Sequence, residues 1–165
     1  MIGHRLAALA LVPLVGAAQP AVPPQLPPID HVVVLKTART ITLYSQGQDV
    51  HMIEGIQMGD QPLGPKRFQG DERTPEGRYE IDYGNPQSSY YLSLHISYPS
   101  EDDAAYARMH GRSPGGQIFI HGQPNGLALG RIPGDWTDGC IAVANREMDL
   151  LWEHVPDGTS IDILP

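Results

Sequence analysis

Short apolar runs and alternating polar and apolar positions recur along most of the chain, which is typical of β-strands. Residues 91–98 alternate most strictly, so one face of this segment is apolar and the other is polar. Residues 59–74 are instead rich in glycine, proline and charge, and they are predicted to form a loop. Further strands are predicted at residues 31–35, 40–44, 50–57, 78–82, 118–122 and 160–164.

Two segments have helical features. Residues 100–109 begin with Ser100, a favourable N-cap residue, and acidic residues follow in the first turn. Asn145 is predicted to cap a second helix. The apolar stripe of this helix consists of Met148, Leu151, Trp152 and Val155. The predicted fold class is therefore α+β, mainly β with short helices.

The first 29 residues differ in composition from the rest. Residues 1–18 carry Arg5, then a run of leucine, alanine and valine, then small residues, which predicts a signal peptide. The apolar run is shorter than the ~20 residues that span a bilayer. An uncleaved N-terminal anchor is the alternative to a signal peptide. Residues 19–29 are proline-rich and are predicted to be an extended spacer. Residues 30–165 have the length and composition of one globular domain.

The charge balance excludes several classes of partner. The whole chain has a net charge of −8, and loss of residues 1–18 would make it −9, because only Arg5 is removed. An acidic chain is a poor ligand for nucleic acid and for anionic lipid surfaces. We therefore expect no nucleic-acid partner. The predicted signal peptide indicates export, so we expect no stable membrane insertion after its cleavage and a location in the periplasm or cell envelope.

One histidine and the only cysteine occupy the ends of two apolar runs. His121 closes residues 118–121, while Cys140 follows Gly139 and precedes a second apolar run. The loop 123–135 between them is rich in glycine and proline, and it could cover the intervening space or move as a lid. A lone cysteine near a histidine suits thiolate catalysis, although a free cysteine is more often a buried apolar residue.

These residue types define a mechanism. A free thiol has a pKa of about 8.5, so a base that accepts its proton increases the reactive fraction at neutral pH. We assign this role to His121, which could later protonate the leaving amine. Cys140 is then the nucleophile, and the backbone N–H groups of Gly139 and Cys140 are the candidate oxyanion donors.

Candidate substrate contacts are Trp136, Thr137, Asp138 and His95, each with a structural alternative. Trp136 could form a wall of the site or pack in the core. Asp138 could orient a substrate ammonium group or cap a turn. His95 lies on the polar face of its strand and could border the site or simply face solvent.

Other charged side chains are assigned structural roles. Lys66 and Arg131 could meet substrate carboxylates, but solvated loop charges are the favoured interpretation. His31, His51, His110 and His154 have no ligand spacing. A zinc site made of His95, His121 and Cys140 is an open alternative, although the spacing matches no compact zinc motif. We expect no metal and no cofactor.

Several motifs resemble one known family. His121-Gly122 followed by Thr137-Asp138-Gly139-Cys140 is similar to the signature of the L,D-transpeptidase (YkuD-type) catalytic domain. Upstream, Gly64-Pro65-Lys66, Gly70-Asp71 and the segment 74–79 resemble other motifs of that domain, so the resemblance covers residues 30–165. It implies a single β-sandwich- or barrel-like domain, an exported enzyme, and peptidoglycan stem peptides as partners. It also implies that the carbonyl of Gly122 orients His121.

Two positions depart from the common form of the family. Asp138 stands where histidine is usual, and Ala142 stands where arginine is usual. This variation resembles a divergent murein transpeptidase-like branch whose members include an amidase. The expected function is a cysteine-dependent L,D-transpeptidase that forms a thioester. A cysteine hydrolase (an amidase or L,D-carboxypeptidase) on the same polymer and a catalytically silent wall-binding module are the alternatives, and the oligomeric state is left open.

Overall fold

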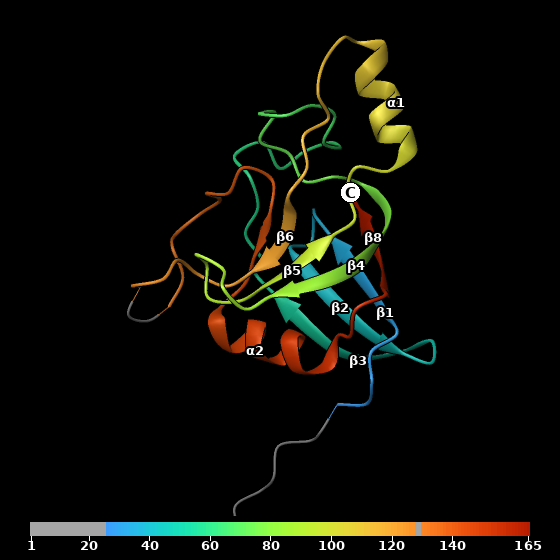
Figure 1. The fold of residues 1–165 in the computed structure, drawn as a ribbon. Helices are drawn as coiled ribbons and strands as arrows, with labels where there is room; N and C mark the ends of the chain where they lie inside the picture. The colour runs from blue at the N-terminus through green and yellow to red at the C-terminus, as the bar shows by residue number, and fades with distance from the viewer. Residues whose placement is uncertain (1–25, 128–129) are drawn as a thin grey trace, which may run out of the picture.

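The computed structural model describes residues 26–127 and 130–165, so the predicted signal peptide and most of the spacer lie outside the described residues. The described chain forms an eight-stranded sheet with two short helices (Figure 1). The strands are β1 (His31–Leu35), β2 (Thr40–Ser45), β3 (Gln48–Glu54), β4 (Gly77–Asn85), β5 (Ser93–Ile96), β6 (Ile118–His121), β7 (Ile141–Ala142) and β8 (Thr159–Leu164). The helices are α1 (Glu101–Met109) and α2 (Asn145–His154).

The sheet curls until its two ends almost meet. Its strand order is β3-β2-β1-β8-β4-β5-β6-β7, so β3 and β7 are the outermost strands. Gln57, just beyond β3, nevertheless bridges Ala142 of β7, with backbone N···O distances of 2.9 and 2.8 Å. A second bridge joins Gly59 to Thr137. The mainly β fold with short helices predicted from the sequence is thus confirmed, in a barrel-like form.

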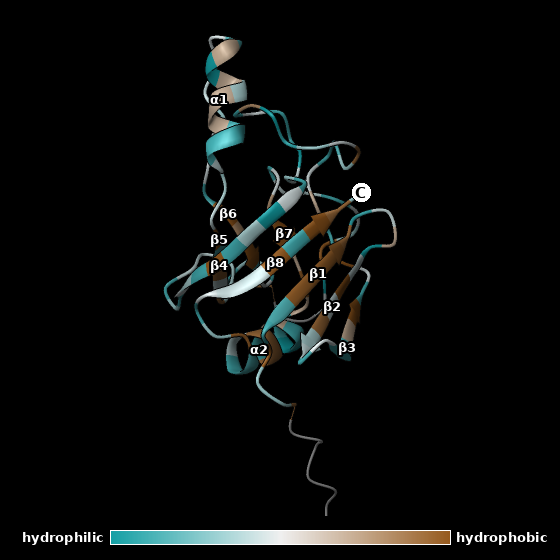
Figure 2. Cartoon of the chain, turned by 90° about the vertical axis from the view of Figure 1, so that its right-hand side faces the viewer, coloured by the Kyte–Doolittle hydropathy of each residue, from teal (hydrophilic) through white to brown (hydrophobic). Residues whose placement is uncertain are grey.

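Branched aliphatic side chains fill the interior of the curled sheet. In Figure 2 much of β1 and the end of β8 are brown, the colour of hydrophobic residues. Each such side chain stabilises the fold by about 1.5–3 kcal/mol when it is fully buried. Helix α2 contributes Met148 and Leu151 to this core, and Trp152 packs against it, so the predicted apolar stripe is confirmed. Fully buried strand residues include Val32, Val34, Ile41, Leu43, Ile81, Ile96, Ile120, Ile141, Ile161 and Ile163.

Helix α1 is capped as predicted. The Ser100 hydroxyl accepts from the N–H of Asp103 at 3.2 Å, and the Asp103 carboxylate accepts from the N–H of Ser100 at 3.1 Å. The same carboxylate accepts a hydrogen bond from the Tyr79 hydroxyl of β4 at 2.9 Å. This contact fastens a helix that otherwise projects from one end of the sheet (Figure 1).

Helix α2 begins differently from the prediction. Ala144 is its N-cap, and the Glu147 carboxylate accepts from the N–H of Ala144 at 2.8 Å. Asn145 is therefore the first helical residue and not the cap. Its side-chain oxygen accepts from the backbone N–H of Gln123 at 2.8 Å, next to the end of β6.

Several predicted boundaries also shift, and the strand expected at residues 78–82 runs from Gly77 to Asn85. The strand expected at residues 50–57 runs from Gln48 to Glu54, and the one expected at residues 91–98 is limited to Ser93–Ile96. Ile29 is 2% exposed and donates its N–H to the carbonyl of His154 at 3.2 Å. The last residues of the expected spacer thus belong to the packed domain.

A buried lysine anchors the long loop between β3 and β4. Lys36 is 2% exposed, and its ammonium group donates to the carbonyls of Gly64 at 2.7 Å and Thr74 at 3.1 Å. It also pairs with the carboxylate of Glu76 at 2.8 Å. The loop 59–74 is therefore held at its midpoint and its end. Among the described residues, no helix has the length and apolar character needed to cross a membrane.

Replacing Glu76 with alanine should destabilise the protein strongly. The change leaves the buried ammonium group of Lys36 without a counter-charge, which costs about 3 kcal/mol of unfolding free energy. Urea denaturation measures this loss. Arg78→Ala is the control, because it breaks an exposed pair with Asp162 and should cost less than about 1 kcal/mol. Equal effects of the two substitutions would contradict the structural role of the buried pair.

Candidate active site

The parallel pairing of β6 and β7 brings the histidine and the cysteine together. Ile120 pairs with Ile141, and His121 pairs with Ala142. Because side chains alternate along a strand and both isoleucines are fully buried in the core, His121 projects from the opposite face. Cys140, one residue before Ile141, shares that face. Both side chains line one cavity of about 670 Å³.

Aromatic rings enclose the imidazole. The ring of Tyr90 lies 4.7 Å from that of His121, between centroids, and the indole of Trp136 lies 5.6 Å from it. The remaining walls come from the anchored loop after β3 and from residues 113–118. Trp136 thus borders the site, as one of the two sequence interpretations proposed. Its indole nitrogen is buried and has no hydrogen-bond partner within the described part of the chain.

Hydrogen bonding fixes the orientation of the imidazole. Nδ1 of His121 lies 2.7 Å from the carbonyl oxygen of Gly122, and a carbonyl can only accept. Nδ1 therefore carries the proton, and Nε2 is left as an acceptor. The side chain is 4% exposed, and this burial lowers the pKa of His121 against the opposing effect of the Gly122 carbonyl. The imidazole is accordingly neutral at neutral pH.

The thiol is also held in its neutral form. Burial raises the pKa of Cys140, and the negative charge of Asp138 raises it further. A backbone hydrogen bond from Phe119 and the charge of Lys66 act in the opposite direction and are outweighed. The sulfur lies 3.5 Å from the carbonyl oxygen of Gln117, which can accept the thiol proton's hydrogen bond. The site thus combines a protonated thiol with an unprotonated imidazole.

A tight turn presents the cysteine. The Thr137 hydroxyl donates to the carbonyl of Cys140 at 2.7 Å and accepts from the N–H of Gly139 at 3.2 Å. Gly139 has a φ of 120°, and a Cβ at this position would collide with the carbonyl oxygen of Arg73. Only glycine fits this turn without rearrangement.

This turn changes two of the assignments made from sequence. The N–H of Gly139 was expected to stabilise an oxyanion, but it donates to the Thr137 hydroxyl. Thr137 was expected to contact substrate; it lines the cavity, and its hydroxyl stabilises the turn. The N–H of Cys140 has no acceptor among the described residues. It is therefore the available backbone donor beside the sulfur.

Two carboxyl groups stand together at the edge of the cavity. Glu72 and Asp138 both line it, and Asp138 is exposed. The pKa of Glu72 is raised by burial, then by the charge of Asp138 and a hydrogen bond with it, and further by Asp60. Negative charge is therefore concentrated on one side of the thiol.

His95 does not take part in this cavity. Its Nδ1 lies 2.6 Å from a carboxylate oxygen of Asp82, and its ring stacks on Tyr83 at 4.5 Å. Phe119 pairs with His95 in the sheet and lies between it and the cysteine strand, with the two rings 4.9 Å apart. The position of His95 contradicts the predicted substrate contact. Across residues 26–127 and 130–165, no three histidine, cysteine or carboxylate side chains are grouped as a metal site, so the proposed zinc ligands are not brought together.

Lys66, one of the two candidate cations of the loops, is buried and not solvated. Lys66 borders the cavity, but it is 3% exposed and pairs with Asp71 at 2.9 Å. Asp71 also accepts from the backbone N–H groups of Arg67 and Phe68, which hold its pKa low in spite of its burial. The pair of Lys66 and Asp71 therefore shapes the loop after β3.

The predicted covering loop lies elsewhere. None of its described residues, 123–127 and 130–135, lines the cavity of Cys140. The Asp135 carboxylate accepts from Nη1 and Nη2 of Arg39, at 2.6 and 2.7 Å, and from the N–H of Met58 at 2.9 Å. The loop is thus tied to the end of the barrel. This finding argues against the prediction that it covers the site.

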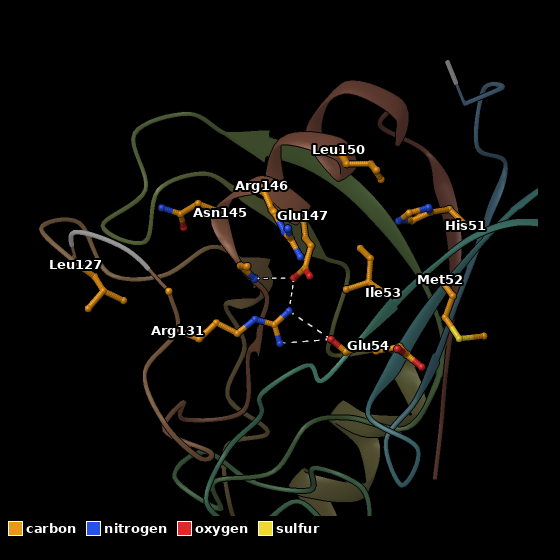
Figure 3. A pocket seen from close by; sticks show the side chains of 12 residues that line it. His51, Met52, Ile53, Glu54, Leu127, Arg131, Asn145, Arg146, Glu147 and Leu150 are labelled. Atoms are coloured by element: carbon orange, nitrogen blue, oxygen red, sulfur yellow. Dashed lines mark hydrogen bonds and ion pairs between the residues drawn. The ribbon is translucent and has the colours of Figure 1, made fainter. Parts of the chain in front are cut away.

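A larger cavity of about 930 Å³ opens between β3, α2 and this loop (Figure 3). Arg131 crosses it and binds the carboxylate of Glu147 together with the carbonyls of Glu54 and Gly55. This cavity contains no thiol and only one histidine, His51, among its lining residues. The thiol and the candidate general base both lie in the smaller cavity.

Sequence reasoning missed several residues of the site. Tyr90 and Glu72 reach the cavity from loops whose positions no local pattern indicates. Asn145 had been assigned to helix capping, and its contact with Gln123 depends on the tertiary fold. The only hint of this contact in the sequence was that two amide side chains, Gln123 and Asn145, lie shortly after His121 and Cys140 respectively.

Known proteins resemble this chain in sequence. YafK of Escherichia coli strain K12 is 29% identical over 130 residues, which make up 76% of this chain and 46% of YafK. YqjB of Bacillus subtilis strain 168 is 30% identical over 95 residues, 55% of this chain and 52% of YqjB. Both are provisionally named as L,D-transpeptidases. The chain spans about half the length of these curated relatives.

Solved structures share the fold. The helical cell shape determining protein Pgp2 from Campylobacter jejuni superposes with a TM-score of 0.65 and 28% identity, covering 82% of this chain and 47% of Pgp2. An L,D-transpeptidase from Mycobacterium smegmatis has a TM-score of 0.54 and 15% identity, covering 82% of this chain and 58% of that protein. The latter likeness concerns the fold alone, and it confirms the predicted L,D-transpeptidase-type architecture.

The sequence model of one family covers nearly all of the described domain. It is described as the L,D-transpeptidase catalytic domain, and it matches residues 29–163. The match includes His121 and Cys140 and both strands that carry them. The chain therefore belongs to the L,D-transpeptidase catalytic domain family.

Proposed function

We propose that this chain is an exported L,D-transpeptidase that acts on peptidoglycan stem peptides through a thioester on Cys140. The main support is the shared cavity of Cys140 and His121, in which the imidazole keeps Nε2 free to accept a proton. Membership of the family supports a transpeptidase role on peptidoglycan. Export to the periplasm or cell envelope rests on residues 1–18 of the sequence alone.

Acylation begins with proton transfer from the thiol to Nε2 of His121, as the sulfur attacks the peptide carbonyl carbon. The carbonyl oxygen becomes an oxyanion, and the N–H of Cys140 is the donor that we assign to it. The carbon–nitrogen bond then breaks, and His121 returns the proton to the leaving amine. D-alanine departs, and a thioester on Cys140 remains.

Deacylation reverses these roles. An acceptor amine attacks the thioester carbonyl, His121 takes a proton from the amine nitrogen, and the carbon–sulfur bond breaks. The thiolate then recovers a proton, so the enzyme is regenerated and a new amide bond is formed. If water attacks instead, the product is a free carboxylate.

The choice of acceptor divides two functions. A transferase must bind its acceptor amine, which is mostly protonated in water, and the carboxyl groups of Asp138 and Glu72 at the cavity edge would attract this ammonium group. The ammonium group loses one proton to solvent before the neutral amine attacks the thioester. A hydrolase needs only water. The alternative, a cysteine amidase or L,D-carboxypeptidase on peptidoglycan or its protein links, is favoured by Ala142, which replaces the arginine usual in the family. A role in wall remodelling and cell shape is compatible with either outcome, and Pgp2 is named for cell shape.

The first prediction from this proposed function concerns the thioester. Incubation with a tetrapeptide muropeptide should give an adduct on Cys140 equal in mass to the donor without its D-alanine, as seen by intact-protein mass spectrometry. His121→Gln should slow adduct formation by about 10²–10⁴-fold, because the general base is lost. Cys140→Ala should form no adduct.

The released products separate the two functions. A cross-linked dimer requires transfer to an amine, whereas a trimmed monomer requires only water. A folded wild-type protein that stays unmodified, with unchanged muropeptide, would contradict both enzyme functions and favour a binding module.

The second prediction concerns the protonation state of the resting enzyme. Because the pKa of Cys140 is raised, its thiolate fraction should still increase as the pH rises through 9. The rate of alkylation by iodoacetamide, followed by mass spectrometry, should therefore increase over this range without a plateau. A plateau between pH 5 and 7 would instead indicate a preformed thiolate–imidazolium pair.

The third prediction tests the acceptor side of the site. Asp138→Asn removes one charge near the cavity and should raise the KM for an amine acceptor about 5–10-fold, since a charge-assisted contact is lost. Hydrolysis of the thioester by water should change little. Glu101→Gln is the control, because Glu101 is exposed in the first turn of α1, away from the cavity. Equal acceptor KM values for Asp138→Asn and wild type would contradict the proposed contact.

A further inference from the structure

One peptide unit lies between the catalytic histidine and the start of α2. The carbonyl oxygen of Gly122 and the N–H of Gln123 belong to this unit, which is planar and trans, so the two groups point in opposite directions. The carbonyl faces Nδ1 of His121 at 2.7 Å. The N–H donates to Oδ1 of Asn145 at 2.8 Å.

We propose that Asn145 is a positioning residue that sets the tautomer of His121 through this peptide unit. Holding the N–H toward α2 turns the carbonyl toward the imidazole. The carbonyl then keeps the proton on Nδ1 and leaves Nε2 as the acceptor for the thiol proton. The two hydrogen bonds also polarise the shared peptide in the same direction.

Asn145 is itself firmly held. It is the first residue of α2, and that helix is fixed by the buried side chains of Met148 and Leu151. Its capping role is taken by Ala144 and Glu147, so its amide group is free for this contact. Asn145 borders the larger cavity, and in Figure 3 its side chain points away from Glu147 and Leu150.

The fit around Gly122 leaves little freedom for the peptide unit. A Cβ at Gly122 would lie 2.7 Å from Oδ1 of Asn145 and 2.8 Å from Cβ of Tyr91, so only glycine allows this approach. The N–H of Gly122 donates to the carbonyl of Leu92 at 3.1 Å. The peptide on the N-terminal side is therefore fixed by Leu92, the residue that precedes β5.

The following residue is fixed as well. The buried side chain of Gln123 donates to the carbonyl of Val143 at 2.9 Å and accepts from the N–H of Ile132 at 2.9 Å. The orientation of the Gly122–Gln123 peptide thus has fixed neighbours on both sides, and Asn145 supplies the acceptor for its N–H. Removing that acceptor leaves a donor unsatisfied and allows the peptide to rotate.

Two substitutions separate positioning from simple structural support. Asn145→Ala removes the acceptor, whereas Asn145→Asp keeps an oxygen at the same place and adds a negative charge. The tautomer and pKa of His121 are measured by ¹⁵N NMR of the labelled imidazole, which requires no activity. Arg146→Ala is the matched control, because Arg146 is the next residue and also lines the larger cavity (Figure 3), whereas the acceptor for the Gln123 N–H is the Asn145 side chain.

Wild type and Arg146→Ala should hold the proton of neutral His121 on Nδ1. Asn145→Ala should give a mixture of the two tautomers. Asn145→Asp should restore the Nδ1–H tautomer and raise the pH at which His121 is protonated, because the carboxylate increases the polarisation of the peptide. A tautomer and a protonation pH unchanged in both Asn145 variants would overturn the inference, and so would equal behaviour of the two variants.

The kinetic consequence rests on the proposed transpeptidase function. Asn145→Ala should lower kcat for thioester formation about 10–100-fold with KM changed less than threefold, and Asn145→Asp should recover most of kcat with its acid limb shifted to higher pH. If the wild type is inactive, the proposed function fails while the NMR result still decides the inference. If Asn145→Ala does not fold, the isosteric Asn145→Asp variant decides it through the protonation pH.

Discussion

The pairing of β6 with β7 is the contact on which the site depends. Ile120 and Ile141 lie side by side in the core, and their burial fixes the register of two strands that are far apart in sequence. A shift of the β6–β7 register by one residue would place Ile120, in place of His121, on the face of the sheet that borders the cavity. The bridge from Gln57 to Ala142 supports β7 from its other side, so the cysteine strand is held between two neighbours although it is only two residues long.

Burial then sets the chemistry of the pair. The same enclosure by Tyr90, Trp136 and the anchored loop favours the uncharged forms of both the thiol and the imidazole. The resting site therefore contains no thiolate–imidazolium ion pair, and the thiol proton must be transferred to His121 as the sulfur of Cys140 attacks. This transfer demands an accurate imidazole orientation, because the unprotonated nitrogen must face the sulfur. The hydrogen bonds that run from His121 through the Gly122 peptide to Asn145 meet this demand.

The sequence allowed the outline of the fold and the candidate pair of His121 and Cys140, which the structure places in one cavity, to be predicted for different reasons. Alternation and apolar runs follow directly from burial on one face of a sheet, and α1 has its cap in adjacent residues. His121 and Cys140 carry a recognisable motif at strand ends. The roles of Thr137 and Gly139 could not be predicted, since the turn determines which donors remain free. His95 was predicted on the polar face of its strand, but its ring lies against Tyr83 and Phe119, and the interposed ring of Phe119 depends on strand order.

The central claim is that the imidazole of His121 and the sulfur of Cys140 share one cavity in the resting protein. It is tested most directly by recording the ¹⁵N NMR signals of the histidine rings before and after Cys140 is blocked with methyl methanethiosulfonate. The account predicts that the ring signals of His121 and its protonation pH change, while those of His95 remain as they were. An unaltered His121 in a fully modified, folded protein would contradict it.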